Sequence, residues 1–163
     1  MNPKVLEIKP SGIRKFFDIA NEIEDVISLS IGEPDFVTPW HVRQEGIRSL
    51  EEGKTWYSPN RGFSELRQEI CKWFSRHYKV DYNPDKECLV TVGGSEAIDG
   101  ALRCLICPGD EVLIPQPSFV CYEPMTVMAD GVPVIIETKE ENHFRLTKEE
   151  LLRHITNKTK VLI

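Results

Sequence analysis

The chain has 163 residues, of which 40% are hydrophobic and 28% are charged, a composition typical of a soluble globular domain and not of a disordered chain. The formal net charge of −6 argues against a nucleic-acid partner, because phosphate backbones are bound by basic surfaces. No apolar run approaches the roughly 18 residues that a membrane helix needs, so no membrane partner is expected.

The first half of the chain is predicted to be mainly helical. Residues 13–24 have the spacing of a short amphipathic helix, and residues 26–31 form a short apolar strand or extended segment. Thr38 is expected to cap a helix that ends near Glu52. Residues 63–78 place their large apolar side chains on one face and predict a strong helix.

Strands and helices alternate in the second half. Apolar strands are predicted at residues 88–92, 111–114, 133–137 and from 160 onward. Helices are predicted to start near Ser95, over residues 122–129, and after Thr147, where Glu150 completes a capping box. This alternation predicts an α/β fold with a mostly parallel sheet and helices on both faces.

The stretch TVGGSEAIDGALRCL, residues 91–105, lies where a predicted strand passes into a predicted helix. Consecutive glycines let backbone N–H groups converge on the helix N-terminus, which carries about half a positive charge. Ser95 adds a hydroxyl donor, so the turn is a candidate phosphate site, the alternative being a tight turn that merely needs glycine. Neither a GxGxxG nor a GxxxxGK[ST] motif occurs, which disfavours dinucleotide and P-loop sites.

For the cysteines and histidines, the sequence favours structural roles over catalysis or metal binding. The five cysteines indicate reduced thiols and a cytoplasmic location. Cys104 and Cys107 have redox spacing but end a helix, where a redox pair usually begins one, so apolar packing is favoured. The four histidines are scattered without metal-ligand spacing, and no metal site is expected. Phe119 follows the next strand and could stack on a planar ring, with core packing as the alternative.

Several stretches taken together resemble one family. They are LSIGEPDFVTP (29–39), GKTWYSPNRGFSELRQEI (53–70), VTVGGSEAIDGAL (90–102), PGDEVLIPQPSFVCYEPM (108–125) and GVPV (131–134). They resemble the N-terminal portion of the fold-type I pyridoxal-phosphate aminotransferases, in the aspartate aminotransferase class I/II group. The resemblance implies an αβα sandwich. Residues 1–30 would be an N-terminal arm and small-domain segment, and residues 31–163 the incomplete N-terminal half of the large cofactor domain.

The resemblance implies a role for each matching position. Gly94, Ser95, Glu96 and Ala97 match the turn that binds the phosphate of pyridoxal 5'-phosphate through backbone N–H groups and a hydroxyl. Some relatives have lysine in place of Ser95.

Three further positions match the family outside this turn. Phe119 matches the aromatic residue that stacks on the pyridine ring, where many relatives have tryptophan or tyrosine. Tyr57 matches a tyrosine that reaches the partner subunit's cofactor phosphate in a homodimer. Gly32 matches a glycine where the substrate carboxylate approaches the backbone.

The family's catalytic residues have no match in this chain. The Schiff-base lysine, the aspartate on the pyridine nitrogen and the substrate-binding arginine would lie beyond Ile163. We therefore interpret the sequence as part of a longer chain, and expect the 163 residues alone to bind cofactor weakly and not to catalyse transamination.

The resemblance implies amino transfer from an L-amino acid to a 2-oxo acid by a ping-pong mechanism. Two alternatives stay open. The first is a carbon–sulfur β-lyase of the same fold. The second is a non-catalytic truncated module, because fold alone does not fix function.

Overall fold

The structure is a computed structural model that describes residues 3–8, 12, 16, 19, 22–23, 25, 27, 32 and 34–163. It divides into two compact units: Met1–Pro10 with Val90–Ile163, here called the sheet unit, and Ser11–Leu89, here called the helical unit. The elements expected over residues 13–24 and 26–31 lie almost entirely outside the described residues.

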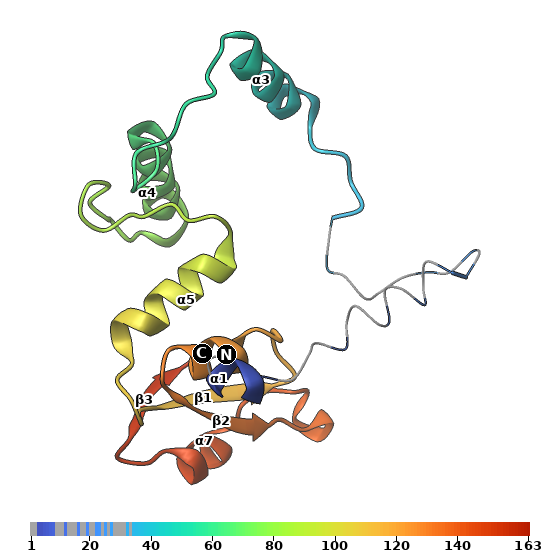
Figure 1. Ribbon diagram of the computed structural model, residues 1–163, viewed down its shortest axis with the longest axis vertical. Coiled ribbons are helices and arrows are strands. Elements are labelled where there is room, and N and C mark those ends of the chain that lie inside the picture. The colour runs from blue at the N-terminus through green and yellow to red at the C-terminus, as the bar shows by residue number, and fades with distance from the viewer. Residues whose placement is uncertain are drawn as a thin grey trace. The chain divides into compact units, whose positions relative to one another are not determined.

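Within the described part of the chain, three parallel strands form a sheet (Figure 1). The central strand β1 (Glu111–Gln116) pairs with β2 (Val132–Glu137) on one edge and with β3 (Thr159–Leu162) on the other. Leu113 lies opposite Val134 in β2 and Leu162 in β3. The three strands predicted in this part of the sequence are therefore confirmed, and so is their parallel arrangement.

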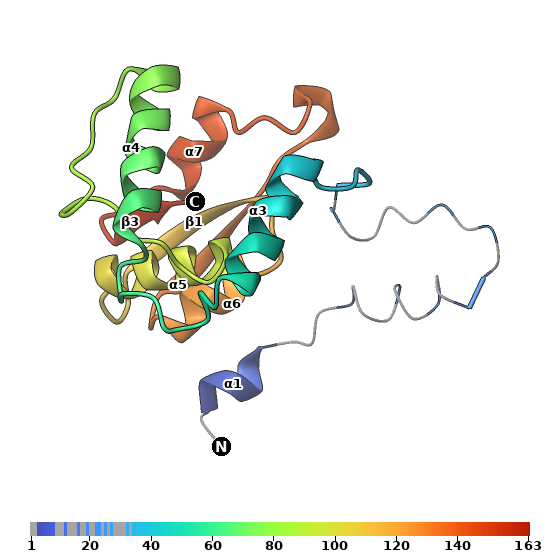
Figure 2. The same cartoon turned by 90° about the horizontal axis from the view of Figure 1, so that it is seen from above.

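The central strand is buried on both faces. Val112 and Ile114 pack with residues of α5 (Gly94–Leu105) and α6 (Tyr122–Met128) and their ends, namely Leu102, Ile106 and Ala129. Leu113 is buried on the opposite face. The helix α7 (Lys148–His154) and α6 lie on opposite sides of the sheet (Figures 1 and 2). Helices thus cover both faces, as parallel strands require.

Among the described residues, two further short elements belong to the sheet unit. The helix α1 (Pro3–Glu7) packs near α6, and Lys4 pairs with Asp130. The 3₁₀ helix η1 (Glu140–Asn142) follows β2.

At the start of α7, one of the two hydrogen bonds of the expected capping box is formed. The hydroxyl oxygen of Thr147 accepts the N–H of Glu150 at 3.2 Å, which confirms the cap. The Glu150 carboxylate accepts from Arg153 at 2.8 Å, so it serves a pair along the helix and not the N–H of Thr147.

The helical unit contains α3 (Trp40–Glu51) and α4 (Ser64–Tyr78). The predicted α4 is confirmed within one residue. The helix α3 begins at Trp40 after an extended Pro39 with ψ 140°, so Thr38 is not its cap. None of the described helices, here or in the sheet unit, is long and apolar enough to cross a membrane.

The strand predicted at residues 88–92 is wrong. These residues form no strand and pair with none in the described part of the chain, and Val92 lies in a bend. Leu89 is 64% exposed and Val92 is 92% exposed. An apolar segment without a partner strand has no hydrogen-bond ladder to stabilise it as a strand. The helix predicted to follow it is confirmed as α5.

Candidate functional site

The first part of the candidate site is the glycine turn, residues 93–97, at the start of α5. Gly93 has φ +85° and ψ 165°, a region that side-chain-bearing residues rarely enter. Its N–H donates to the carbonyl of Thr91 at 2.9 Å, and the Thr91 hydroxyl donates to the carbonyl of Gly93 at 2.9 Å. These bonds fold the chain sharply into the helix and explain why glycine stands at position 93.

The glycine turn presents backbone donors to an anion. The first N–H groups of an α-helix have no carbonyl partner within the helix. Gly93 is the N-cap residue of α5, and no side-chain hydrogen bond caps this helix. This leaves the N–H groups of Gly94, Ser95 and Glu96 at the positive end of the α5 dipole. A Cβ at Gly94 would meet nothing within 4 Å, so the backbone there is open to a ligand. The donor set and the open approach fit a phosphate group.

Glu96 adds an interaction that the sequence alone did not indicate. Its carboxylate accepts the N–H of Val92, which holds the entry of the turn. A negative charge in the first turn stabilises the helix dipole, but it also repels a bound phosphate. The Glu96 side chain is therefore no phosphate ligand, and only its N–H fits the predicted contact.

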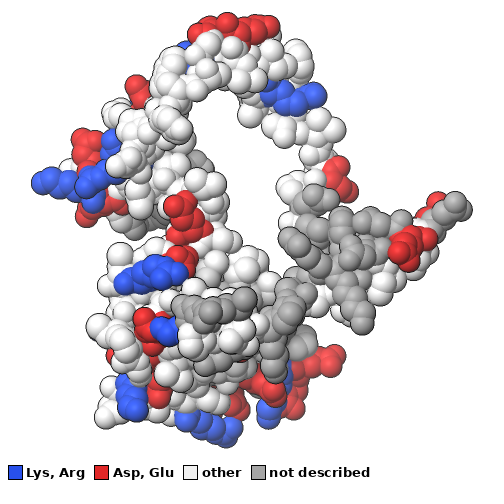
Figure 3. All heavy atoms as spheres, in the orientation of Figure 1, with Lys and Arg blue, Asp and Glu red and all other residues white. Residues whose placement is uncertain are grey.

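No basic side chain of α5 assists the turn. Arg103 lies in the last helical turn and donates to Asp99 at 2.7 Å, and this bond raises the pKa of the Arg103 guanidinium. Acidic and basic side chains are interspersed over the parts drawn in Figure 3. Within α5, the backbone alone therefore supplies positive potential at the glycine turn.

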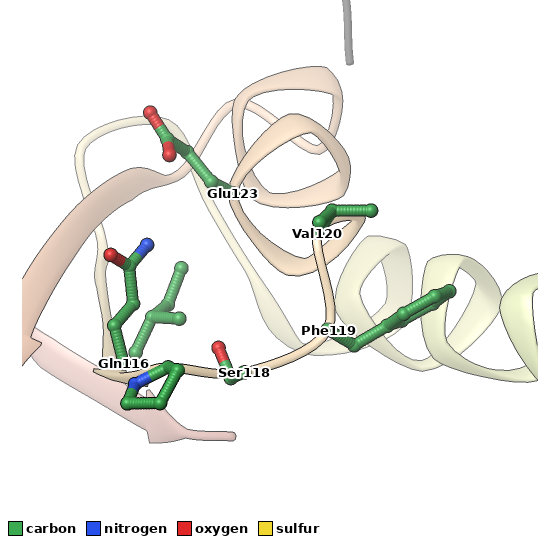
Figure 4. A pocket seen from close by; sticks show the side chains of 7 residues that line it. Gln116, Ser118, Phe119, Val120 and Glu123 are labelled. Carbon is green, nitrogen blue, oxygen red and sulfur yellow. The ribbon is translucent and has the colours of Figure 1, made fainter. Parts of the chain in front are cut away.

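The second part of the candidate site is a pocket of about 350 Å³ beyond the carboxyl end of β1. Its polar lining comes from Gln116, Ser118 and Glu123, with Phe119 and Val120 beside them (Figure 4). Ligands of parallel α/β sheets bind at this end of the strands. The prediction from residue patterns did not include this pocket, because its polar residues come from the end of β1, the following loop and α6.

Phe119 lies on the loop that lines this pocket. Its ring contacts Tyr122 edge-on, with ring centroids 5.6 Å apart, and the residue remains 46% exposed. In Figure 4 the ring points away from Gln116 and Ser118. No ring contact or hydrogen bond of the described residues joins its side chain to the glycine turn, so its stacking role stays a prediction.

Tyr57 and Gly32 belong to the helical unit, whereas the glycine turn and Phe119 belong to the sheet unit. Tyr57 is fully exposed, and Gly32 is exposed as well. The roles of both residues stay predictions. Among the described residues, no group of three or more histidine, cysteine, aspartate or glutamate side chains could hold a metal ion.

Comparisons with known proteins point to one family. Residues 24–163 match the family model for aminotransferase class I and II. The aspartate aminotransferase of Pyrococcus abyssi is 45% identical over 163 residues, which are 100% of this chain and 42% of that protein. The aromatic-amino-acid aminotransferase 2 of Thermococcus litoralis is 45% identical over 156 residues, which are 96% of this chain and 40% of that protein.

A solved structure gives the same result. Aspartate aminotransferase from Thermus thermophilus with maleate superposes with a TM-score of 0.90 at 37% identity, covering 99% of this chain and 43% of that chain. The chain thus spans about two fifths of the length of these relatives.

Proposed function

Since the chain belongs to the aminotransferase class I and II family, we propose that the whole protein is a pyridoxal-phosphate-dependent aminotransferase. It moves an amino group from an L-amino acid to a 2-oxo acid by a ping-pong mechanism, so the first product leaves before the second substrate binds. The observation that carries the proposal is the glycine turn, with its open backbone donors at the start of α5.

When bound, pyridoxal phosphate supplies an aldehyde that bonds to the amino group and a ring that takes up electrons from the substrate α-carbon. The N–H groups of Gly94, Ser95 and Glu96 and the Ser95 hydroxyl would hold its phosphate. Hydrogen bonds from neutral donors to a charged acceptor contribute about 1.5–3 kcal/mol each, so this turn can supply much of the cofactor affinity.

The remaining predicted residues would position the ring and the substrate. Phe119 would stack on the pyridine ring, since nearly half of its surface is accessible. Gly32 would let the substrate carboxylate approach the backbone. Tyr57 would reach the phosphate held by the second subunit of a homodimer, which fits its full exposure in this chain.

The proposed substrates are an L-amino acid and a 2-oxo acid. Relatives named for aspartate and for aromatic amino acids are both 45% identical to this chain, so the likeness does not separate them. All five cysteines are free thiols, which supports a reducing compartment and hence a cytoplasmic location.

The proposed reaction is tested on protein expressed from its native gene. A panel of L-amino acids is incubated with 2-oxoglutarate, and glutamate and the matching 2-oxo acid are measured. We expect equal amounts of the two products and parallel lines in double-reciprocal plots. Pyruvate and ammonia released from a thioether amino acid, without any 2-oxo acid acceptor, would instead establish the β-lyase.

The phosphate role of the glycine turn needs a separate test. Gly94→Pro removes one N–H at the first helical position, where proline is well tolerated. Gly94→Ala keeps that N–H and serves as the matched control. We expect the proline variant to lose about tenfold or more in affinity for pyridoxal phosphate, with little change for unphosphorylated pyridoxal. Equal affinities of the two variants for pyridoxal phosphate would exclude this N–H as a phosphate donor.

A further inference from the structure

Two thiols share a pocket in the helical unit. Cys71 lies on α4 and is 8% exposed, and Cys88 is half-buried in the segment that follows the helix. Both line a pocket of about 320 Å³, together with apolar side chains such as Phe74 and Leu89 and with the acidic Glu87. Residues that are 17 positions apart in the sequence thus meet at one site.

The two thiols are neighbours in this pocket. Burial, followed by the neighbouring Cys88 and Glu87, raises the pKa of the Cys71 thiol. Cys71 is therefore protonated at neutral pH. The more accessible Cys88 is the thiol that an oxidant meets first.

Arg67 holds the two segments together. It lies one helical turn before Cys71 and donates to the carbonyl of Pro84 and, at 3.1 Å, to the carboxylate of Asp85. Its Nε also donates to the carbonyl of Gly62 at 3.4 Å. These bonds fix the loop along α4 just before it reaches Cys88, so the meeting of the thiols is imposed by the fold.

We propose that Cys71 and Cys88 are an oxidisable dithiol that closes to an intramolecular disulfide and joins α4 to the segment leading into the glycine turn. The oxidant is a small disulfide such as oxidised glutathione. The Cys88 thiolate attacks one of its sulfurs and expels one thiolate. Cys71 then loses its proton to water, and its sulfur attacks the Cys88 sulfur and expels the second thiolate. The two cysteines lose two electrons and two protons, and the small disulfide is reduced to two thiols.

The linkage can be read directly by mass spectrometry. Protein from the native gene is equilibrated with oxidised glutathione, its remaining thiols are alkylated, and it is digested with trypsin. Cys71 then lies in peptide 68–72 and Cys88 in peptide 87–103, each as the only cysteine. We expect these two peptides to appear joined, with the mass of two hydrogens lost.

The controls separate native geometry from chance pairing. Cys71→Ser and Cys88→Ser should each abolish the joined peptides, and Cys104→Ser, at an exposed thiol, should not. The joined pair should be about tenfold or more enriched over a sample oxidised in denaturant, because the fold raises the effective concentration of one thiol at the other. Cys88 left as a stable mixed disulfide with glutathione, or pairing no more frequent than in denaturant, would overturn the proposal. Neither result depends on aminotransferase activity.

Discussion

At Gly93 the backbone adopts φ +85° and ψ 165°, whereas its neighbour Gly94 is the first residue of a helix with open space around it. Gly93→Ala is therefore expected to lower the free energy of unfolding by about 1–3 kcal/mol. Gly94→Ala should leave it unchanged or raise it by up to about 1 kcal/mol, because alanine favours the helix. Urea unfolding followed by circular dichroism measures both, and similar losses in the two variants would contradict a special backbone requirement at Gly93.

Glu96 places a carboxylate beside the proposed phosphate site while it holds the N–H of Val92. In Glu96→Gln the amide oxygen can still accept this N–H, but the charge is gone. We expect the variant to bind pyridoxal phosphate about two- to fivefold more tightly, as removal of about 0.3–1 kcal/mol of repulsion implies. The gain should shrink at high salt. Absorbance titration measures it, with Glu149→Gln in the first turn of α7 as the control that should change nothing. Weaker binding would refute the repulsion.

At the scale of elements, α4 is held to its following loop by one buried side chain. Arg67 donates to the carbonyls of Gly62 and Pro84 and to Asp85. Arg67→Met should lower the free energy of unfolding by roughly 2–4 kcal/mol, because it leaves these acceptors without their charged donor. Arg76→Met, at an exposed position of the same helix, should stay within about 0.5 kcal/mol of the parent. Guanidinium unfolding compares the two, and equal effects would show that the network contributes nothing.

The helices and strands also show which elements can be predicted from local sequence patterns. Local apolar patterns predicted α4, α5 and α6 and the strands β1 and β2, and the capping box predicted α7. The same apolar signal failed at residues 88–92, because a strand depends on a partner that local sequence does not specify. The cap at Thr147 was predictable from residue type, but the choice of Glu150 to bind Arg153 was not, since both partners were within its reach.

One part of the candidate site could be predicted from the sequence, and another could not. The glycine turn could be predicted because its whole geometry lies within a few consecutive residues. The pocket beyond β1 could not be predicted, since Gln116 and Glu123 line one pocket only when the loop between strand and helix folds back. The presence of Cys71 and Cys88 in one pocket depends on a loop fixed by Arg67, and the spacing of the cysteines did not indicate it.

At the scale of the whole molecule, the unpaired segment at residues 88–92 gives the sharpest expectation. Leu89 and Val92 are exposed here, yet the chain spans only about two fifths of the length of its relatives. We expect the protein made from the native gene to pair this segment, because apolar strands in parallel sheets are buried on both faces. The amides of Leu89, Val90 and Thr91 should then exchange hydrogen slowly in that protein.

A polypeptide limited to residues 1–163 is the matched comparison. Its amides at the same three positions should exchange rapidly, because their N–H groups meet water and no strand. It should also bind an apolar dye more strongly, through the exposed side chains of Leu89 and Val92. Hydrogen exchange with peptide-level mass spectrometry decides the matter, since peptide 87–103 covers the segment in both proteins. Equally rapid exchange of these amides in both proteins would mean that the segment stays unpaired, and that its apolar sequence serves some purpose other than the sheet.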